Sequence, residues 1–414
     1  MWLECINCHR KYDSHEILYK CPACGHLLDT LYDIEEVKEK SSQIPWRQKP
    51  LSVWRYSPFL PEVSVELVTL NEGGTNLYPC KNLAEKLGIR ELWVKNEGEN
   101  PTGSFKDRGM TVGVTFAREL KSKVVACAST GNTSASLSAY AAKARMLCII
   151  FIPSKKIAMG KLAQAMMYGS KVLAIKDNFD KSLELVAKSC DLFKMYLLNS
   201  VNPYRLEGQK TIGFEVVDQL GSVPDNFILP MGNCGNISAI YKGLVEWKEL
   251  GIIDKIPRFC GIQASGSAPI VHAVKKKSKE VKFVENPETV ATAIRIGKPV
   301  NWEKALRSIY GSNGTAEAVT DQEILEAQKL LARTEGIFVE PASASSIAGL
   351  IKFLELGIID RSDQTVCLTT GHGLKDPNIA IESCEQPLEI EPDMQKIKAI
   401  IEETLAEQKE LIIL

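Results

Sequence analysis

Several short stretches of this chain combine residue types that could do chemistry, and the first is NPTGSFKDRG at residues 100–109. Lys106 follows a small-residue loop and precedes apolar residues at near-helical spacing, so we expect it in the first turn of a helix, capped by Thr102 or Ser104. The positive end of the helix dipole favours the neutral amine, which is the form that attacks carbonyl carbons. Lys106 is therefore our candidate for Schiff-base chemistry, and the alternative is a solvated surface lysine.

A second stretch, STGNT at residues 129–133, follows the strand-like run VVACA and leads into a helical pattern. Ser129, Thr130 and Thr133 offer hydroxyl groups and Asn132 an amide, so the loop could donate several hydrogen bonds to a carboxylate at a helix N-terminus. The alternative is a plain helix cap, which needs only one of these residues.

A third stretch, NSVNPYR at residues 199–205, places an arginine just after a loop. Arg205 could hold an anionic group with two parallel hydrogen bonds, supported by Asn199 and Ser200. The alternative is an arginine in a surface ion pair.

A fourth stretch, GNCGN, lies between a strand-like run at residues 227–229 and a helical pattern. A strand, a glycine-rich loop and a helix in this order form a nest of backbone N–H groups for a phosphate. The stretch lacks the GK[ST] of a Walker loop and the spacing of a dinucleotide fingerprint, so a single phosphomonoester fits better than a nucleoside triphosphate. The residues of the nest are Gly232, Asn233, Cys234, Gly235 and Asn236.

A fifth stretch, TTGHGLKD at residues 369–376, follows another strand-like run. The hydroxyl group of Thr370, at a strand end beside two glycines, can meet a heteroaromatic nitrogen without adding charge. His372 is either a general base or a structural histidine in a tight turn.

Two Cys-x-x-Cys pairs, Cys5 with Cys8 and Cys21 with Cys24, are separated by twelve residues. Four thiolates at this spacing can close a tetrahedral site, which favours structural zinc and leaves no open position for catalysis. Iron and an empty, reduced site are the alternatives. The segment is too short to fold on a hydrophobic core of its own, so the metal would stabilise it.

Short β-branched runs alternate with amphipathic stretches beyond the cysteines, which predicts an α/β fold with a largely parallel sheet. In such sheets ligands lie at the carboxyl ends of the strands, where the loops above are found. We expect a zinc-ribbon-like module at residues 1–40. Residues 34–58 are charged and then proline-punctuated, which is typical of a linker and an entry segment. An amphipathic helix at residues 389–414 would pack against the body or a partner subunit.

The composition excludes several classes of protein. The chain has 414 residues, of which 45% are hydrophobic and 24% charged, and its formal net charge of -1 gives no support for nucleic-acid binding. No apolar run approaches the roughly 18 residues that span a membrane, and the N-terminus lacks the pattern of a signal peptide. We therefore expect a cytoplasmic protein whose twelve cysteines are free, buried or metal-binding.

The motifs NPTGSFKDRG, STGNTSAS, NSVNPYRLEGQKT, GNCGN and TGHGLKDP together resemble those of the fold type II pyridoxal-phosphate enzymes, over roughly residues 67–377. Within that class the chain resembles the threonine synthase family. Sulfhydrylases of this fold carry a more threonine- and glycine-rich phosphate loop, and dehydratases carry a run of glycines. The two asparagines of GNCGN and the GHGLKD turn differ from both. The zinc-ribbon-like extension is also similar to that of some prokaryotic members.

The resemblance implies a fold like that of the tryptophan synthase β subunit, with two mostly parallel α/β subdomains and pyridoxal phosphate between them. In a catalytic unit at residues 41–388, the large subdomain would comprise residues 41–94 and 206–388, and the small one residues 95–205. The resemblance further implies a homo-oligomer, with a dimer as the expected form.

The family pattern also implies roles for the cofactor-binding residues. Lys106 would carry pyridoxal phosphate as a Schiff base, with Phe105 near the ring. Asn132 would donate a hydrogen bond to the 3-hydroxyl oxygen, and Thr370 would contact the pyridine nitrogen. The cofactor phosphate would be held by Gly232, Asn233, Cys234, Gly235 and Asn236.

The implied reaction converts O-phospho-L-homoserine and water to L-threonine and phosphate, the last step of threonine biosynthesis. The substrate carboxylate would bind Ser129, Thr130 and Thr133, and the substrate phosphate would bind Asn199, Ser200 and Arg205. Rival functions on the same fold are a threonine dehydratase and a phosphoserine-dependent cysteine or cysteate synthase. A rival from another class is a non-catalytic adaptor that has kept the fold.

Overall fold

The computed structural model describes residues 1–154, 159–176, 185–186, 188–190, 192–384 and 387–413. The chain forms two units, Met1–Asp376 and Pro377–Leu414. The second unit contains helices α13 (Pro377–Ser383) and α14 (Met394–Ile413), and α14 lies where the apolar spacing of the tail predicts a helix. None of the described helices combines the length and apolar content needed to cross a membrane.

A six-stranded sheet is the centre of the first unit, with the strand order β12-β11-β10-β13-β5-β4. Every neighbouring pair in it is parallel except the edge pair of β4 and β5. Helices cover both faces, so a central strand such as β10 is buried along its whole length. The strands are β4 (Leu77–Pro79), β5 (Glu91–Asn96), β10 (Asn226–Pro230), β11 (Arg258–Ala264), β12 (Thr315–Val319) and β13 (Gln364–Thr369). The helices of this part are α2 (Lys81–Leu87), α7 (Pro203–Leu220), α8 (Gly235–Glu249), α9 (Pro269–Lys275), α10 (Trp302–Gly311), α11 (Asp321–Glu335) and α12 (Pro341–Glu355).

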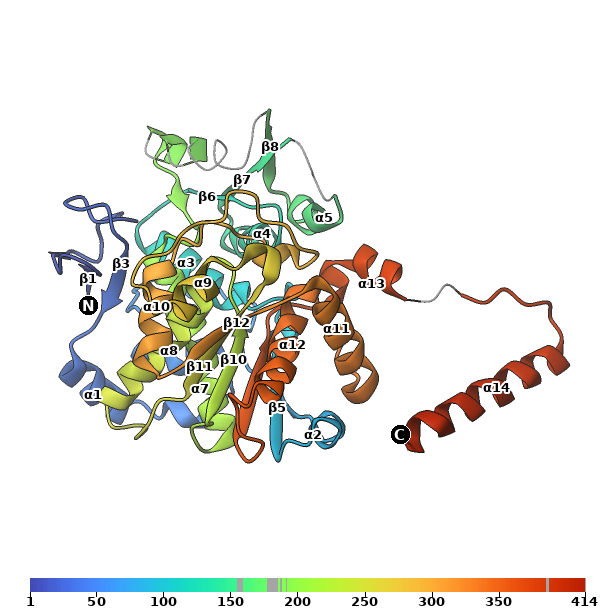
Figure 1. Ribbon diagram of the computed structural model, residues 1–414. Helices are drawn as coiled ribbons and strands as arrows, with labels where there is room; N and C mark the ends of the chain where they lie inside the picture. The colour runs from blue at the N-terminus through green and yellow to red at the C-terminus, as the bar shows by residue number, and fades with distance from the viewer. Residues whose placement is uncertain (155–158, 177–184, 187, 191, 385–386, 414) are drawn as a thin grey trace. The chain divides into compact units, whose positions relative to one another are not determined.

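A second sheet of four parallel strands has the order β8-β7-β6-β9 and lies near the top of Figure 1. The parallel α/β fold expected from the alternating pattern is confirmed by the two sheets. The subdomain boundaries within it stay predictions. The strands of this sheet are β6 (Val124–Ala128), β7 (Leu147–Pro153), β8 (Lys171–Ile175) and β9 (Tyr196–Leu197), and helices α3 (Lys106–Glu119), α4 (Asn132–Ala144) and α5 (Met159–Met167) accompany it.

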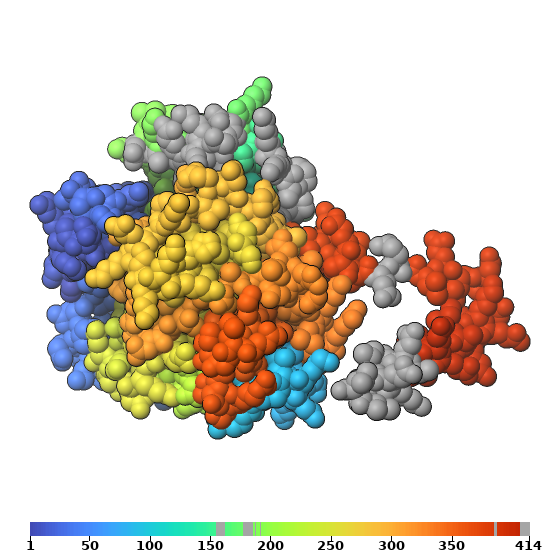
Figure 2. All heavy atoms as spheres, viewed as in Figure 1, coloured from blue at the N-terminus to red at the C-terminus, as the bar shows by residue number. Residues whose placement is uncertain are grey.

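The N-terminal residues form a small antiparallel sheet of the order β2-β1-β3, which with its two Cys-x-x-Cys loops we call the ribbon. Its strands are β1 (Trp2–Cys5), β2 (Lys11–Tyr12) and β3 (Leu28–Leu31). Figure 2 shows these residues, in blue, lying directly against the body of the first unit.

The segment after the ribbon differs from the linker that the prolines suggest. It begins with helix α1 (Ile34–Gln43), whose first N–H groups are capped by the Asp33 carboxylate. Two short 3-10 helices follow, and they bury Trp46 and Phe59 against Trp247, with ring centroids 5.8 Å from it. Large aromatic side chains placed between the prolines bind this segment to the core, so it is part of the folded body.

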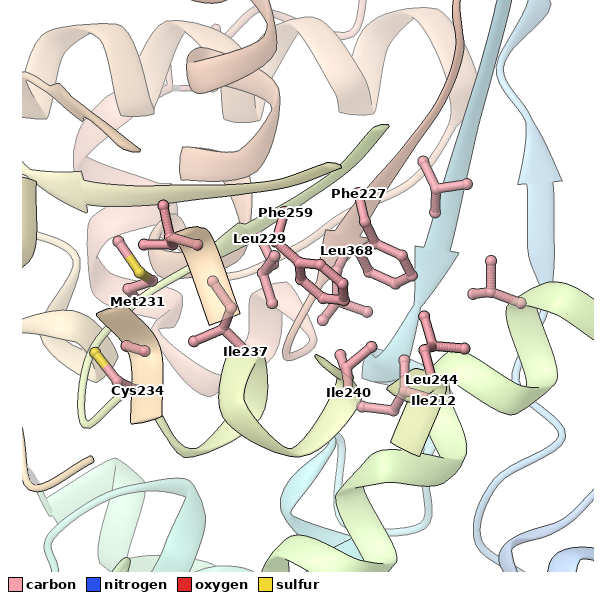
Figure 3. Close-up of a cluster of buried hydrophobic side chains, with 14 of the residues drawn as sticks. Ile212, Phe227, Leu229, Met231, Cys234, Ile237, Ile240, Leu244, Phe259 and Leu368 are labelled. Atoms are coloured by element: carbon pink, nitrogen blue, oxygen red, sulfur yellow. The ribbon is translucent and has the colours of Figure 1, made fainter. Parts of the chain in front are cut away.

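The main core lies between α8 and the large sheet. Figure 3 shows Ile237, Ile240 and Leu244 on α8 facing Phe259 of β11, with Cys234 at one end of the cluster. The loop before α8 is therefore anchored by buried apolar contacts, and truncating one such aliphatic side chain to alanine costs about 2–5 kcal/mol.

A buried ion cluster joins the start of α3 to α7 and β5. Arg108 donates to Glu97 at 2.6 Å and to Glu215 at 2.7 Å, and Lys95 donates to Glu215 at 2.8 Å. All four side chains are fully buried. Because each charge has a partner, the cluster fixes the first turn of α3 without leaving an uncompensated charge.

Candidate active site

Lys106 is the first residue of α3, as its sequence context predicts. The expected cap is wrong, because the N-cap residue is Phe105 and the helix has no side-chain cap hydrogen bond. Instead the Asp107 carboxylate accepts hydrogen bonds from Thr102 N and Oγ1, at 2.7 and 2.6 Å, and from Ser136 Oγ. Asp107 thus holds the loop at Thr102 against the start of the helix that Lys106 begins.

Lys106 is a half-buried residue, and its Nζ atom lies 4.0 Å from the centroid of the Phe105 ring. The pKa of Lys106 is lowered to about 7, mainly by burial and to a lesser extent by the positive charge of Arg205, while Glu340 opposes the shift. A large fraction of the amine is therefore neutral near pH 7, which supports the nucleophilic role over that of a solvated surface lysine.

Backbone hydrogen bonds bring the lysine loop and the TGHG turn together. Phe105 N donates to Thr370 O at 3.1 Å, and His372 N donates to Gly103 O at 2.9 Å. His372 Nδ1 accepts from Leu374 N, so the ring caps a short 3-10 turn. This contact favours the structural alternative for His372.

Asn132, the first residue of α4, donates from Nδ2 to both carboxylate oxygens of Glu340 at 3.1 Å. Glu340 is buried and precedes α12. A Cβ atom at Gly371 would lie 2.6 Å from Glu340 Oε1, so only glycine fits between these groups. Glu340 was not predicted from the sequence, where its signal is an acidic residue followed by a proline at a helix start.

Thr370 lies at the end of β13 and is buried. Its hydroxyl oxygen is 3.0 Å from Ser343 Oγ, and Thr370 N donates to the same atom at 2.8 Å. Ser343, which was not predicted from the sequence either, therefore fixes the position and orientation of the Thr370 hydroxyl group.

The loop at residues 129–133 is half-buried at the end of β6. Gly131 N donates to Ser129 Oγ at 3.2 Å, and a Cβ at Gly131 would meet no described atom within 4 Å. Asn199 exchanges two hydrogen bonds with the backbone of Ala128, at 2.9 and 3.0 Å. The Asn199 amide therefore joins the third stretch to the base of this loop.

Arg205, in the first turn of α7, is fully buried beside α3. Its Nε has no hydrogen-bond partner among the residues that the structure describes. Burial lowers the pKa of Arg205 to about 10. A buried guanidinium group without a counter-charge is costly, so an anionic ligand is the natural complement of this position.

The GNCGN loop links β10 to α8 through Cys234, which has a left-handed backbone with φ of 62°. Both amide atoms of the buried Asn236 lack a hydrogen-bond partner in the described part of the chain, as does Oε1 of Gln209. A Cβ at Gly235 would lie 3.8 Å from that Gln209 oxygen. Unsatisfied polar atoms and free backbone N–H groups at a helix start fit the phosphate group of pyridoxal phosphate.

The four ribbon cysteines come together, with the Sγ atoms of Cys5, Cys8, Cys21 and Cys24 all within 4.8 Å of one another. The backbone N–H groups of Asn7 and Cys8 point to Cys5 Sγ at 3.5 Å. The donor set fits a tetrahedral zinc ion.

The chain matches the model of the family "Pyridoxal-phosphate dependent enzyme" over residues 68–371, and it belongs to that family. Solved structures show the same fold: maize serine racemase has a TM-score of 0.65 at 18% identity, covering 92% of this chain and 100% of that one.

More closely, the chain belongs to the threonine synthase family. It is 60% identical to threonine synthase from Methanocaldococcus jannaschii, over 97% of this chain and 100% of the relative. It is 56% identical to threonine synthase from Methanosarcina acetivorans, over 96% and 98%.

Proposed function

We propose that this protein is a lyase that converts O-phospho-L-homoserine and water to L-threonine and phosphate. The observation that carries the proposal is the buried Arg205, whose Nε has no hydrogen-bond partner among the described residues and whose charge acts on the amine of Lys106. A reaction that releases phosphate is favoured by a cation that neutralises the charge of the leaving group. The threonine synthases that resemble this chain along most of their length support the same reaction.

Pyridoxal phosphate, when bound, supplies an electron sink at the substrate's α carbon. Lys106 would hold it covalently beside Phe105, and Asn132, oriented by Glu340, would face its 3-hydroxyl oxygen. Thr370, oriented by Ser343, would meet the pyridine nitrogen as a neutral partner. The cofactor phosphate would lie on the loop of Gly232, Asn233, Cys234, Gly235 and Asn236.

The substrate would be held at both of its charged ends. Ser129, Thr130 and Thr133 would bind the carboxylate at the start of α4, and Arg205 would bind the phosphate, with Asn199 and Ser200 shaping the loop beside it. Lys106, as the neutral amine, would accept the α proton and transfer protons again at the β carbon. Phosphate would leave from the γ carbon and water would add at the β carbon.

The phosphate site also argues against the rival functions. A threonine dehydratase acts on a substrate without a phosphate group, which would leave Arg205 buried without a counter-charge. A phosphoserine-dependent synthase would satisfy Arg205, and it is therefore the rival that product analysis has to exclude. A non-catalytic adaptor has no need for a lysine with a lowered pKa.

The test is to supply phosphohomoserine, phosphoserine, serine and threonine separately and to measure released phosphate and amino-acid products. We expect threonine and phosphate in equal amounts from phosphohomoserine alone. Lys106→Ala is the matched control, and we expect its turnover to fall by at least about 10³-fold. Faster turnover of another substrate would refute the proposal, as would borohydride fixation of the cofactor on a different lysine.

We further propose a structural zinc ion on Cys5, Cys8, Cys21 and Cys24, a ribbon module ending near residue 40, and a cytoplasmic homodimer. The zinc proposal is supported by the clustered sulfur atoms. Metal analysis of the purified protein and its mass in solution test the zinc and the dimer.

A further inference from the structure

The ribbon contacts helix α10 through charged side chains. Asp29 of β3 forms ion pairs with Lys304 at 2.7 Å and with Arg307 at 2.8 Å. His26, two residues after Cys24, has its Nδ1 atom 2.9 Å from Glu303 Oε1. Asp29 and Lys304 are almost fully buried, so the position of α10 depends on the folded ribbon.

Asn301, the N-cap residue of α10, joins the two loops to which the proposed function assigns phosphate groups. Its backbone N donates to Asn233 O at 3.1 Å, and its Nδ2 donates to Asn233 O at 3.2 Å and to Ser200 O at 3.1 Å. Asn301 is buried, and two carbonyl acceptors fix the orientation of its amide. It lies one helical turn before Lys304, the residue that the ribbon holds.

The ribbon also contacts the segment that carries the substrate-phosphate residues. Leu197 N donates to Tyr19 OH at 2.7 Å, two residues before Asn199. Tyr204 OH donates to Ser14 O, and Tyr204 directly precedes Arg205. Both ribbon contacts thus reach the residues that flank the predicted phosphate site.

We propose that Asn301 is a positioning residue that sets the separation of the GNCGN loop and the loop at Ser200, and that the metal-bound ribbon holds Asn301 in place through α10. The inference rests on the proposed function for the identity of the phosphate ester. The cofactor phosphate is assigned to one loop and the substrate phosphate to the other, so the spacing of the loops sets where the substrate phosphate meets its donors. Hydrogen bonds to an anion require donors in fixed positions, so substrate binding depends steeply on this spacing. If the ribbon only stabilised the fold, loss of its metal would lower the unfolding temperature and leave the phosphate affinity unchanged.

The experiment compares the holoenzyme with Asn301→Ala, with the metal-free double variant Cys5→Ser, Cys8→Ser, and with the combination of all three changes. The control is Asn226→Ala, which removes a buried amide and its two side-chain hydrogen bonds from the opposite end of β10. For each protein, kcat and KM for phosphohomoserine are measured well below its unfolding temperature. The affinity for inorganic phosphate is measured from the absorbance change of the bound cofactor.

We expect Asn301→Ala and the cysteine variant each to raise KM and the phosphate Kd by about tenfold, with kcat changed by less than about threefold. The combined variant should be no worse than the poorer single one, because both changes act through the same residue. Asn226→Ala should lower stability and leave both constants unchanged.

Additive effects, or unchanged phosphate affinity in either variant, would overturn the proposal. Lack of measurable phosphate binding by the wild type would overturn it too. Failure of the wild type to turn over phosphohomoserine would instead reject the proposed function, while the phosphate titration would still decide the role of Asn301.

Discussion

Two arginines on neighbouring helices are buried to the same extent but in opposite electrostatic settings. Arg108 on α3 is 0% exposed and Arg205 on α7 is 1% exposed. Arg108 donates hydrogen bonds to Glu97 and Glu215, which hold its pKa well above the usual range. Burial instead lowers the pKa of Arg205.

This difference separates a structural charge from a ligand-binding one. A buried charge surrounded by its own counter-charges leaves nothing for a ligand to satisfy. A buried charge without counter-charges destabilises the free protein. The free-energy cost of burying it is compensated only when an anionic ligand binds. The two settings predict opposite effects of the same substitution on stability and on substrate binding.

The largest effect is expected at Arg108. Arg108→Met would leave Glu97 and Glu215 buried with only Lys95 as a compensating cation, and we expect the free energy of unfolding to fall by about 3–5 kcal/mol. Urea denaturation of the cofactor-free protein measures this change. A loss below about 1 kcal/mol would show that the cluster is not the structural anchor we describe.

At Arg205 the same substitution should act on substrate binding. Arg205→Met leaves no carboxylate unpaired among the described residues, so the free energy of unfolding should stay the same or rise. We expect kcat/KM for phosphohomoserine to fall by about 10²-fold, with cofactor binding retained. Arg205→Lys should recover only part of the loss, because an ammonium group cannot replace the bidentate fork. Loss of the cofactor with unchanged substrate affinity would mean that the two phosphate sites are exchanged.

The sequence predicted the elements better than the contacts between them. Glycine-rich turns after strand-like runs predicted the loops at Lys106, Gly131 and Gly232, because turn chemistry and hydrophobic periodicity are local properties. The prediction of a linker was wrong, because aromatic residues in the two 3-10 helices after α1 pack against Trp247 of the distant helix α8. Such long-range packing has no signal in a local pattern.

The residues that orient the candidate site were missed for the same reason. Glu340 lies 208 residues from its partner Asn132, and Ser343 lies 27 residues from its partner Thr370. Only the tertiary fold brings each pair together. Arg205 was predicted from the sequence as an anion-binding residue. The sequence could not show whether a carboxylate group of the protein pairs with it. That distinction, on which the comparison with Arg108 depends, required the structure.

The smallest predicted effect concerns the pH dependence of cofactor capture, which links Arg205 to Lys106. The pKa of Lys106 is lowered from 10.5 to about 7 by burial first and by the charge of Arg205 second. Only the neutral amine attacks the aldehyde, so the rate of pyridoxal-phosphate attachment to cofactor-free protein should fall about tenfold per pH unit below pH 7 and level off above it. Stopped-flow absorbance after mixing measures this rate.

Two variants sharpen this prediction by moving the midpoint in opposite directions. Arg205→Met removes a positive charge that opposes protonation, so the midpoint should move to higher pH. Glu340→Gln removes the carboxylate that favours the charged amine, so the midpoint should move to lower pH. Each shift should be about one pH unit or less, since each charge adds to an effect that burial dominates. A wild-type rate that still rises steeply at pH 9 would show an ordinary lysine and would remove the electrostatic link between the two residues.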